Sequence, residues 1–178
     1  MVKELVRSNK LNSIQISSQR GFTLIELLLY MGLLTIIVGV LSTLFVSIIE
    51  VRLESKANSN VEQDGRYLIA RLAYDIRRAN GATPIVSPIL GATSSSLQIQ
   101  IDSVNYTYSI AGSNLALTNN LGTDNLNGYE TTVSGLTFQR LGNSGGKNSI
   151  QVSFTLTSNT IRNSGTEVRN FQTTIATR

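Results

Sequence analysis

The stretch QRGFTLIELLLYMGLL, residues 19–34, opens the apolar block that decides the fold. No charged residue lies between Leu27 and Ile49. As a helix rising 1.5 Å per residue, this block spans about 34 Å, which exceeds the roughly 30 Å of a bilayer's hydrocarbon core. Its preceding flank is basic, so the positive-inside rule places the N-terminus in the cytoplasm. The sequence therefore predicts a single-pass membrane helix with its C-terminal domain outside the cytoplasm.

Two other interpretations of the block fit less well. A buried helix of a soluble domain has one apolar face, whereas this block is apolar on all sides. A cleaved signal peptide has an apolar region of about 7–15 residues followed by a small-residue cleavage site. This block is longer, and no such site stands clearly at its end.

Composition excludes several kinds of site. The 178 residues include no Cys and no His, so disulfides and Cys/His metal centres are excluded. The net charge is +4, but residues 1–21 hold four basic residues against one acidic residue and so carry +3 of it. The remainder is nearly neutral, and nucleic-acid binding is therefore not expected.

Glu26 is the one carboxylate at the start of the apolar block. An unpaired carboxylate in or beside hydrocarbon costs a few kcal/mol. One interpretation is that Glu26 lies at the interface and reaches toward the cytoplasmic head groups. The other is that a cut between Gly21 and Phe22 creates an α-amine four residues earlier, which neutralises Glu26 within one chain or between neighbours.

The segment RGFTLIELLLYMGLLTIIVGV resembles the N-terminal signature of type IV pilins and type II secretion pseudopilins. It has the basic leader residue Arg20, then Gly21 before the scissile bond, Phe22 as the new N-terminus, and Glu26 at the fifth mature position. The resemblance implies cleavage after Gly21 and N-methylation of Phe22 by a prepilin peptidase/methyltransferase. It also implies that Glu26 pairs with the N-terminal amine of a neighbouring subunit and sets the assembly register.

The same resemblance implies partners and a location. The partners are other pilin or pseudopilin subunits, a membrane-embedded assembly platform and the lipid bilayer. The chain is expected in the cytoplasmic (inner) membrane first, and then in an extracellular or periplasmic filament. Many major pilins have a proline that bends the membrane helix, and this chain has none there. Gly39 with Ser42 and Thr43 either loosens the helix instead or forms a small-residue packing face.

The sequence predicts an α+β fold in which a long N-terminal helix packs on a C-terminal antiparallel β-sheet domain, the pilin fold. Apolar residues at helical spacing predict that the helix continues to Ala79, with Asn80-Gly81 as its C-cap. Period-two alternation then predicts about six strands. The expected organisation is a cytoplasmic leader (1–21), a membrane or filament-core helix (22–49), an amphipathic continuation (50–80) and a β-domain (81–178).

The face Val61–Ile76 of the helix is expected to complete the core, and the aromatic residues of the strands are expected to point inward. These are Tyr106, Tyr108, Phe138 and Phe154. Four arginines on the helix are interleaved with acids, which predicts a solvated or salt-bridged face rather than a nucleic-acid site. They are Arg66, Arg71, Arg77 and Arg78.

No catalytic constellation is apparent, and we expect no enzyme activity. The sequence GNSGGKNS (142–149) lacks the spacing of a phosphate-binding loop and predicts a hairpin loop. A Ca²⁺ site at Asp124, with Asn120 and Asn125, has a single carboxylate, which favours an ordinary loop. No cofactor is expected.

The order of strands resembles that of the J-type minor pseudopilin and related minor pilins, which implies a minor subunit at the filament tip. The alternatives are a major pilin, or a pilin-like adhesin or DNA-binding module displayed by the β-domain. The sequence does not choose between secretion, motility, DNA uptake and adhesion.

Overall fold

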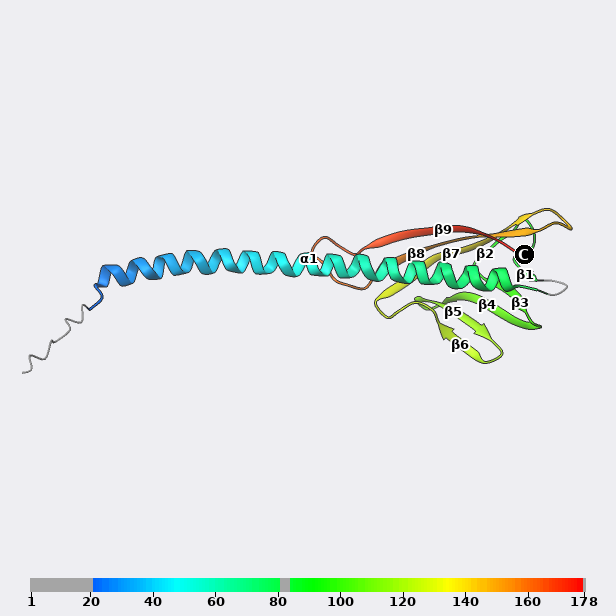
Figure 1. Ribbon diagram of the computed structural model, residues 1–178, viewed down its shortest axis with the longest axis horizontal. Coiled ribbons are helices and arrows are strands. Elements are labelled where there is room, and N and C mark those ends of the chain that lie inside the picture. Colours follow the sequence, from blue (N-terminus) through cyan, green and yellow to red (C-terminus); the bar gives the residue numbers. More distant parts are fainter. Residues whose placement is uncertain (1–20, 81–83, 178) are drawn as a thin grey trace, which may run out of the picture. The chain divides into compact units, whose positions relative to one another are not determined.

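The computed structural model describes residues 21–80 and 84–177 (Figure 1). Helix α1 (Leu24–Arg78) has 55 residues and precedes all the strands. These are β1 (Ile85–Ser87), β2 (Thr93–Ser94), β3 (Leu97–Ile101), β4 (Val104–Ala111), β5 (Asn114–Asn119), β6 (Gly122–Asn125), β7 (Thr131–Gly142), β8 (Asn148–Ser158) and β9 (Val168–Ala176). The α+β layout expected from the sequence is confirmed.

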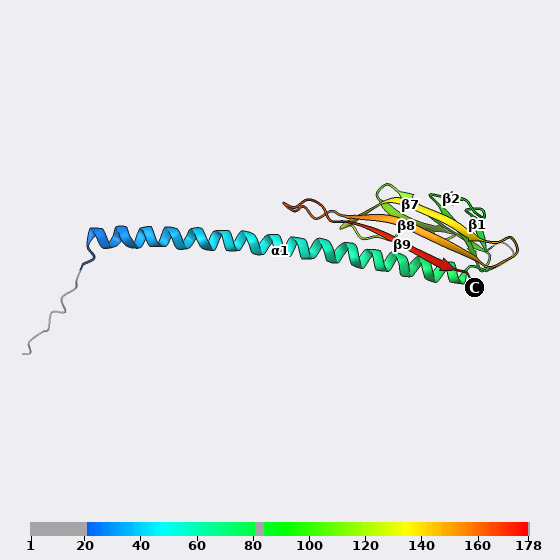
Figure 2. The same ribbon diagram turned by 90° about the horizontal axis from the view of Figure 1, so that it is seen from above.

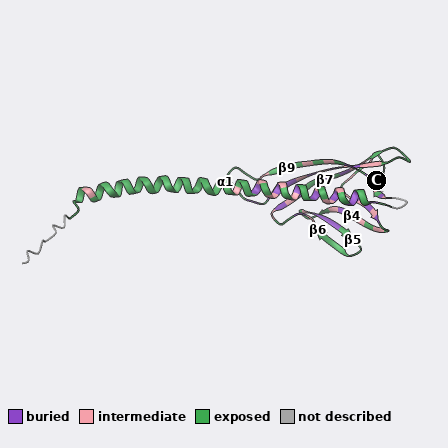
Figure 3. Cartoon of the chain, in the orientation of Figure 1, coloured by how far each residue is buried: buried purple, intermediate pink, exposed green. Residues whose placement is uncertain are grey.

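The chain divides into two units within α1, the first ending at Leu44 and the second beginning at Phe45. In the first unit every described side chain is exposed except Glu26, which is half-buried. In the second unit, buried helix positions begin at Ala57 (Figure 3). The change from uniform exposure to a buried stripe follows the sequence, since the apolar block ends at Ile49 and an amphipathic pattern follows it.

The strands form two antiparallel sheets, with orders β1-β3-β4-β5-β6 and β2-β7-β8-β9. The six strands predicted from alternation are confirmed as β3, β4, β5, β7, β8 and β9. The total of about six was too low, because the described residues also contain β1, β2 and β6. These three strands have two to four residues each, too few for a period-two pattern to be visible.

One face of α1 enters a core shared with both sheets. Val61, Leu68, Leu72 and Ile76 are fully buried and join a cluster with apolar residues of the strands. Three of the four aromatic residues expected to point inward are buried, namely Tyr108, Phe138 and Phe154. The fourth, Tyr106, is half-buried against the same core. The prediction that the helix completes the core of the β-domain (residues 84–177) is therefore confirmed.

The end of α1 is tied to the β3–β4 turn. Asp102 and Ser103 have φ values of +51° and +69°, as a two-residue type I′ hairpin turn requires. The Asn80 side chain donates to Asp102 Oδ1 and accepts from the Asp102 backbone N–H, each at 2.8 Å. Gly81 of the predicted C-cap lies outside the described residues.

A buried polar cluster lies where α1 meets β4. Asp75 is only 1% exposed, and its Oδ2 accepts from Arg71 Nε at 2.8 Å and from the hydroxyl of Tyr108. Burial, and then the neighbouring Asp75 carboxylate, raise the pKa of Tyr108 far above its usual value. The Tyr108 phenol therefore keeps its proton and donates it to Asp75.

The arginine-bearing face is salt-bridged, as predicted. Arg66 pairs with Glu62 at 2.7 Å, Arg71 pairs with Asp75, and Arg78 lies 3.6 Å from Asp102. The sequence pattern did not indicate that Asp75 points into the core.

Two loop predictions have different outcomes. The segment after Gly142 connects β7 to β8, so the predicted hairpin loop is confirmed. The expectation of a loop at Asp124 was wrong, because Asp124 lies in β6 opposite Leu117 of β5. All four β6 residues are exposed, so apolar burial gave no sequence signal for this strand.

Strand β9 runs alongside the second half of α1 (Figures 1 and 2). Gly65 of α1 lies against Phe171 of β9. A Cβ at position 65 would lie 2.2 Å from Phe171 Cζ. The Phe171 ring has little freedom to move away, because it is stacked on buried Phe154 with 5.4 Å between the ring centroids. Glycine is therefore required here by packing.

We expect Gly65→Ala to destabilise the protein by about 1–2 kcal/mol, because the clash outweighs the roughly 1 kcal/mol by which alanine favours a helix. In a Phe171→Ala background the clash is gone, and the same change should instead stabilise by up to about 1 kcal/mol. Urea unfolding of the four variants of this cycle measures the coupling. Equal effects of Gly65→Ala in both backgrounds would contradict the packing argument.

Candidate functional site

The apolar helix begins with a capped turn. Thr23 Oγ1 accepts from the backbone N–H of Glu26 at 3.3 Å, and the Thr23 carbonyl accepts from the N–H of Leu27 at 3.1 Å. Thr23 is thus the N-cap, and Thr-x-x-Glu is the sequence form of a capping box. The helix had been predicted to start at Phe22, but the cap moves its first residue to Leu24.

The cap leaves Gly21 and Phe22 in non-helical, exposed backbone. A Cβ added at Gly21 would meet no atom of the described residues within 4 Å, so the space around Gly21 is free for a protease to approach. Exposed segments without backbone pairing are where proteases cut, and the peptide between Gly21 and Phe22 meets that condition. Arg20 lies outside the described residues.

Glu26 shares one side of the helix start with two aromatic residues. Its Oε1 accepts from the Tyr30 hydroxyl at 3.2 Å. The rings of Phe22 and Tyr30 meet edge to face, with 6.2 Å between their centroids. Phe22, Glu26 and Tyr30 therefore form a small group, the N-terminal cluster, in which Tyr30 contacts the Phe22 ring and donates to the Glu26 carboxylate.

The N-terminal cluster gives Glu26 one hydrogen bond from its own chain. A carboxylate has room for about four hydrogen bonds, so its capacity for a cationic partner is largely retained. Glu26 and Phe22 were expected at this site from the sequence, whereas Tyr30 was not. The available signal was the spacing of four residues from a carboxylate, which places two side chains on neighbouring helix turns.

The helix remains continuous through the block that follows. Hydroxyl groups bond back to the backbone, as from Thr35 to the Met31 carbonyl and from Ser42 to the Val38 carbonyl, each at 2.8 Å. Thr43 donates to the carbonyls of Gly39 and Val40. Gly39 therefore interrupts nothing in α1, and the suggested loosening of the helix is not observed.

The first part of α1 is long and apolar enough to cross a membrane, and none of its most apolar stretch is buried within the chain. Leaving so many apolar side chains in water is costly, at about 25 cal/mol per Å². The exposed residues of the block include Leu28, Leu33, Ile36 and Phe45. Such a surface requires lipid or another protein as its environment.

Residues 16–42 match the family model described as the prokaryotic N-terminal methylation motif. The chain carries a prokaryotic N-terminal methylation motif. The methylation motif covers Arg20, the Gly21–Phe22 bond and Glu26, and it indicates a type IV pilin-like protein that prepilin peptidase processes and the membrane anchors. Searches of the curated proteins and of the solved structures found no match. The methylation motif lies wholly N-terminal to the β-domain, whose fold therefore rests on the structure alone.

Proposed function

We propose that the chain is a structural subunit, of the minor class, in a type IV pilus or type II secretion-like filament. The observation that carries the proposal is the methylation motif placed on a capped helix whose first part exposes apolar residues on every side. Such a helix is stable in a bilayer before assembly and among other apolar helices afterwards. The proposal of a minor class and a place at the tip rests on the resemblance of the sequence pattern to that of the J-type minor pseudopilins.

In this proposal the prepilin peptidase/methyltransferase cuts after Gly21 and methylates the new N-terminus at Phe22. The exposed, non-helical backbone at the bond supports this site. Arg20 belongs to the leader that the peptidase recognises. The leader stays in the cytoplasm, and the β-domain lies on the other side of the inner membrane until assembly.

Glu26 sets the assembly register by pairing with the N-terminal amine of a neighbouring subunit. A single buried polar pair rejects shifted arrangements, because any shift leaves a charge unpaired in an apolar environment. The pair forms during extraction from the membrane by the assembly platform. Tyr30 holds the Glu26 carboxylate at 3.2 Å before this partner arrives.

The chain itself has no enzymatic role in this proposal. Within the described residues, no group of three or more His, Cys, Asp or Glu side chains is placed to hold a metal ion. The buried charged group, Asp75, is engaged with Arg71 and Tyr108. The contact between Asp75 of α1 and Tyr108 of β4 therefore helps to hold the β-domain on its helix.

Quantification of sheared filaments tests the minor class. We expect the chain in the filament fraction at far below one copy per major subunit, with antibody labelling concentrated at one filament end. If this chain instead makes up most of the filament mass, it belongs to the major class. A chain in the membrane fraction but never in filaments would contradict the structural role.

A further inference from the structure

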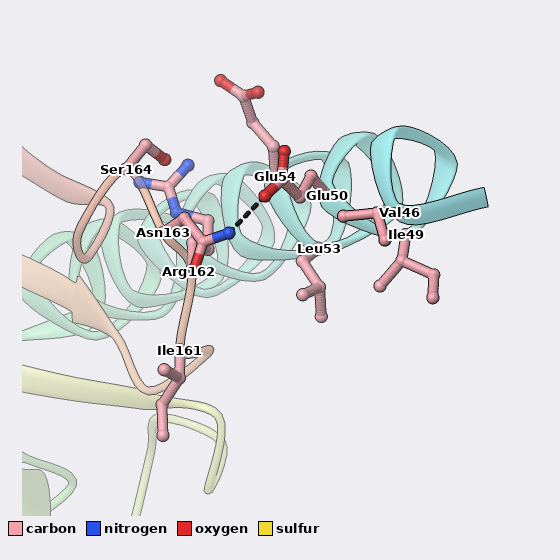
Figure 4. A pocket seen from close by; sticks show the side chains of 9 residues that line it. All are labelled: Val46, Ile49, Glu50, Leu53, Glu54, Ile161, Arg162, Asn163 and Ser164. Carbon is pink, nitrogen blue, oxygen red and sulfur yellow. Dashed lines mark hydrogen bonds between the residues drawn. The ribbon is translucent and has the colours of Figure 1, made fainter. Parts of the chain in front are cut away.

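The loop between β8 and β9 lies beside the helix turns that follow the apolar block. A pocket there is lined on one side by the helix and on the other by the loop (Figure 4). Its lining residues are Val46, Ile49, Glu50, Leu53, Glu54 and residues 161–164. Val46 and Ile49 are also the last part of the uncharged block, so the pocket begins where the membrane segment ends.

The loop presents one large apolar side chain. Ile161 is 87% exposed, which is unusual for isoleucine. Figure 4 shows Ile161, Leu53 and Ile49 directed to the same side, so loop and helix together present an apolar surface. Exposure of this apolar surface to water is unfavourable, at about 25 cal/mol per Å².

Hydrogen bonds and an ion pair within the β8–β9 loop hold its backbone in a defined conformation. Arg162 Nε donates to the Gly165 carbonyl at 2.8 Å, and the Gly165 N–H donates to the Arg162 carbonyl at 3.2 Å. Gly165 has a φ of +91°, which favours glycine in this tight turn. Arg162 also pairs with Glu167 at 3.3 Å, so its charge is neutralised within the loop.

A polar contact fixes the loop to the helix at the end of the block. The Asn163 side chain donates to Glu50 Oε1. Glu50 is the first charged residue after the apolar block, so the contact falls where a membrane helix meets the head groups. The contact thereby holds the loop, with Ile161, beside the end of the apolar block.

From these observations we propose that the β8–β9 loop is a membrane-contact loop, with Ile161 inserted among the phospholipids of the outer leaflet of the inner membrane. The inference rests on the proposed membrane anchoring of the unassembled subunit. Continuity between the pocket and the apolar block selects lipid as the occupant, because a bilayer that surrounds Val46 and Ile49 reaches the same pocket. Asn163 and Ser164 also line the pocket, and lipid head groups would offer them hydrogen-bonding partners.

The test uses the full chain, in which the absence of Cys allows single labelling sites. Variants Ile161→Cys, Leu121→Cys and Ile37→Cys each carry an environment-sensitive nitrobenzoxadiazole label in phosphatidylethanolamine/phosphatidylglycerol vesicles. Leu121 is the matched control, because it is 91% exposed and lies in the β5–β6 turn at the other end of the β-domain (Figure 1). Ile37 lies within the apolar block and reports whether the chain is embedded at all.

We expect spin-labelled lipids to quench the label at position 161 at least about two-fold more than the label at 121, since only an inserted side chain meets the acyl region. Equal quenching at 161 and 121, with strong quenching at 37, overturns the loop proposal and leaves membrane anchoring intact. Weak quenching at all three positions overturns the anchoring itself, and the loop proposal with it. Protection of position 161 in filaments but not in vesicles would show that a neighbouring subunit, and not lipid, covers Ile161.

Discussion

A Glu26→Val variant is expected to be cut and inserted like the parent chain and yet to be missing from filaments. Valine removes the carboxylate while keeping the segment apolar, so insertion into the bilayer becomes no harder. In the filament it leaves the neighbour's N-terminal amine without a counter-charge. Leaving one member of a buried ion pair unpaired costs about 3–5 kcal/mol, which corresponds to a loss of incorporation of at least about 100-fold.

The comparison of membrane and filament fractions by immunoblot measures this loss. Tyr30→Phe is the matched control, because it removes the hydroxyl bonded to Glu26 and keeps the ring that meets Phe22. Its incorporation should stay close to that of the parent chain. Glu26→Gln, which keeps the shape but not the charge, should fail as Glu26→Val does. Normal incorporation of Glu26→Val would refute the register role.

The second large effect concerns the buried carboxylate at Asp75. Asp75→Ala should lower the free energy of unfolding by about 3 kcal/mol, because it leaves the Tyr108 hydroxyl buried without its acceptor and Arg71 without its counter-charge. The Arg71 side chain is 36% exposed, so water partly replaces its lost counter-charge. We therefore do not expect a cost at the upper end of the roughly 3–5 kcal/mol typical of a broken buried ion pair.

Urea unfolding of the full chain in detergent, followed by tyrosine near-ultraviolet circular dichroism, measures the change. Asp75→Asn is the control, since it keeps an acceptor for Tyr108 and loses only the charge. It should cost clearly less than Asp75→Ala. Glu54→Ala, at an exposed helix position, should change stability by no more than about 0.5 kcal/mol. A similarly small change for Asp75→Ala would contradict a stabilising role for the cluster.

The parts of the fold that could be predicted are those with a local signal. The uncharged block and the spacing of Val61, Leu68 and Leu72 predicted α1, and alternation in Leu97, Ile99 and Ile101 predicted β3. Each rests on a repeat within a few neighbouring residues. The segment of residues 20–26 around the Gly21–Phe22 bond also has a local signal, because the residues that mark it lie close together in the sequence.

What was missed depends on contacts between distant residues. Asp75 and Tyr108 are 33 positions apart, and nothing in the sequence around Asp75 distinguishes it from Glu62 and Asp64, which are only half-buried. Gly65 reads as a weak point of the helix until Phe171 is placed against it. Strand β6 has no buried residue and exists because β5 offers a pairing edge, which a sequence pattern does not display.

The most direct test of the account is the intact mass of the chain isolated from membranes, with and without prepilin peptidase. The account predicts loss of residues 1–21 and gain of a single methyl group on Phe22, in the presence of the peptidase only. An uncut chain, or one cut at another bond, would contradict processing at Gly21–Phe22 and with it the proposed entry of this protein into a filament.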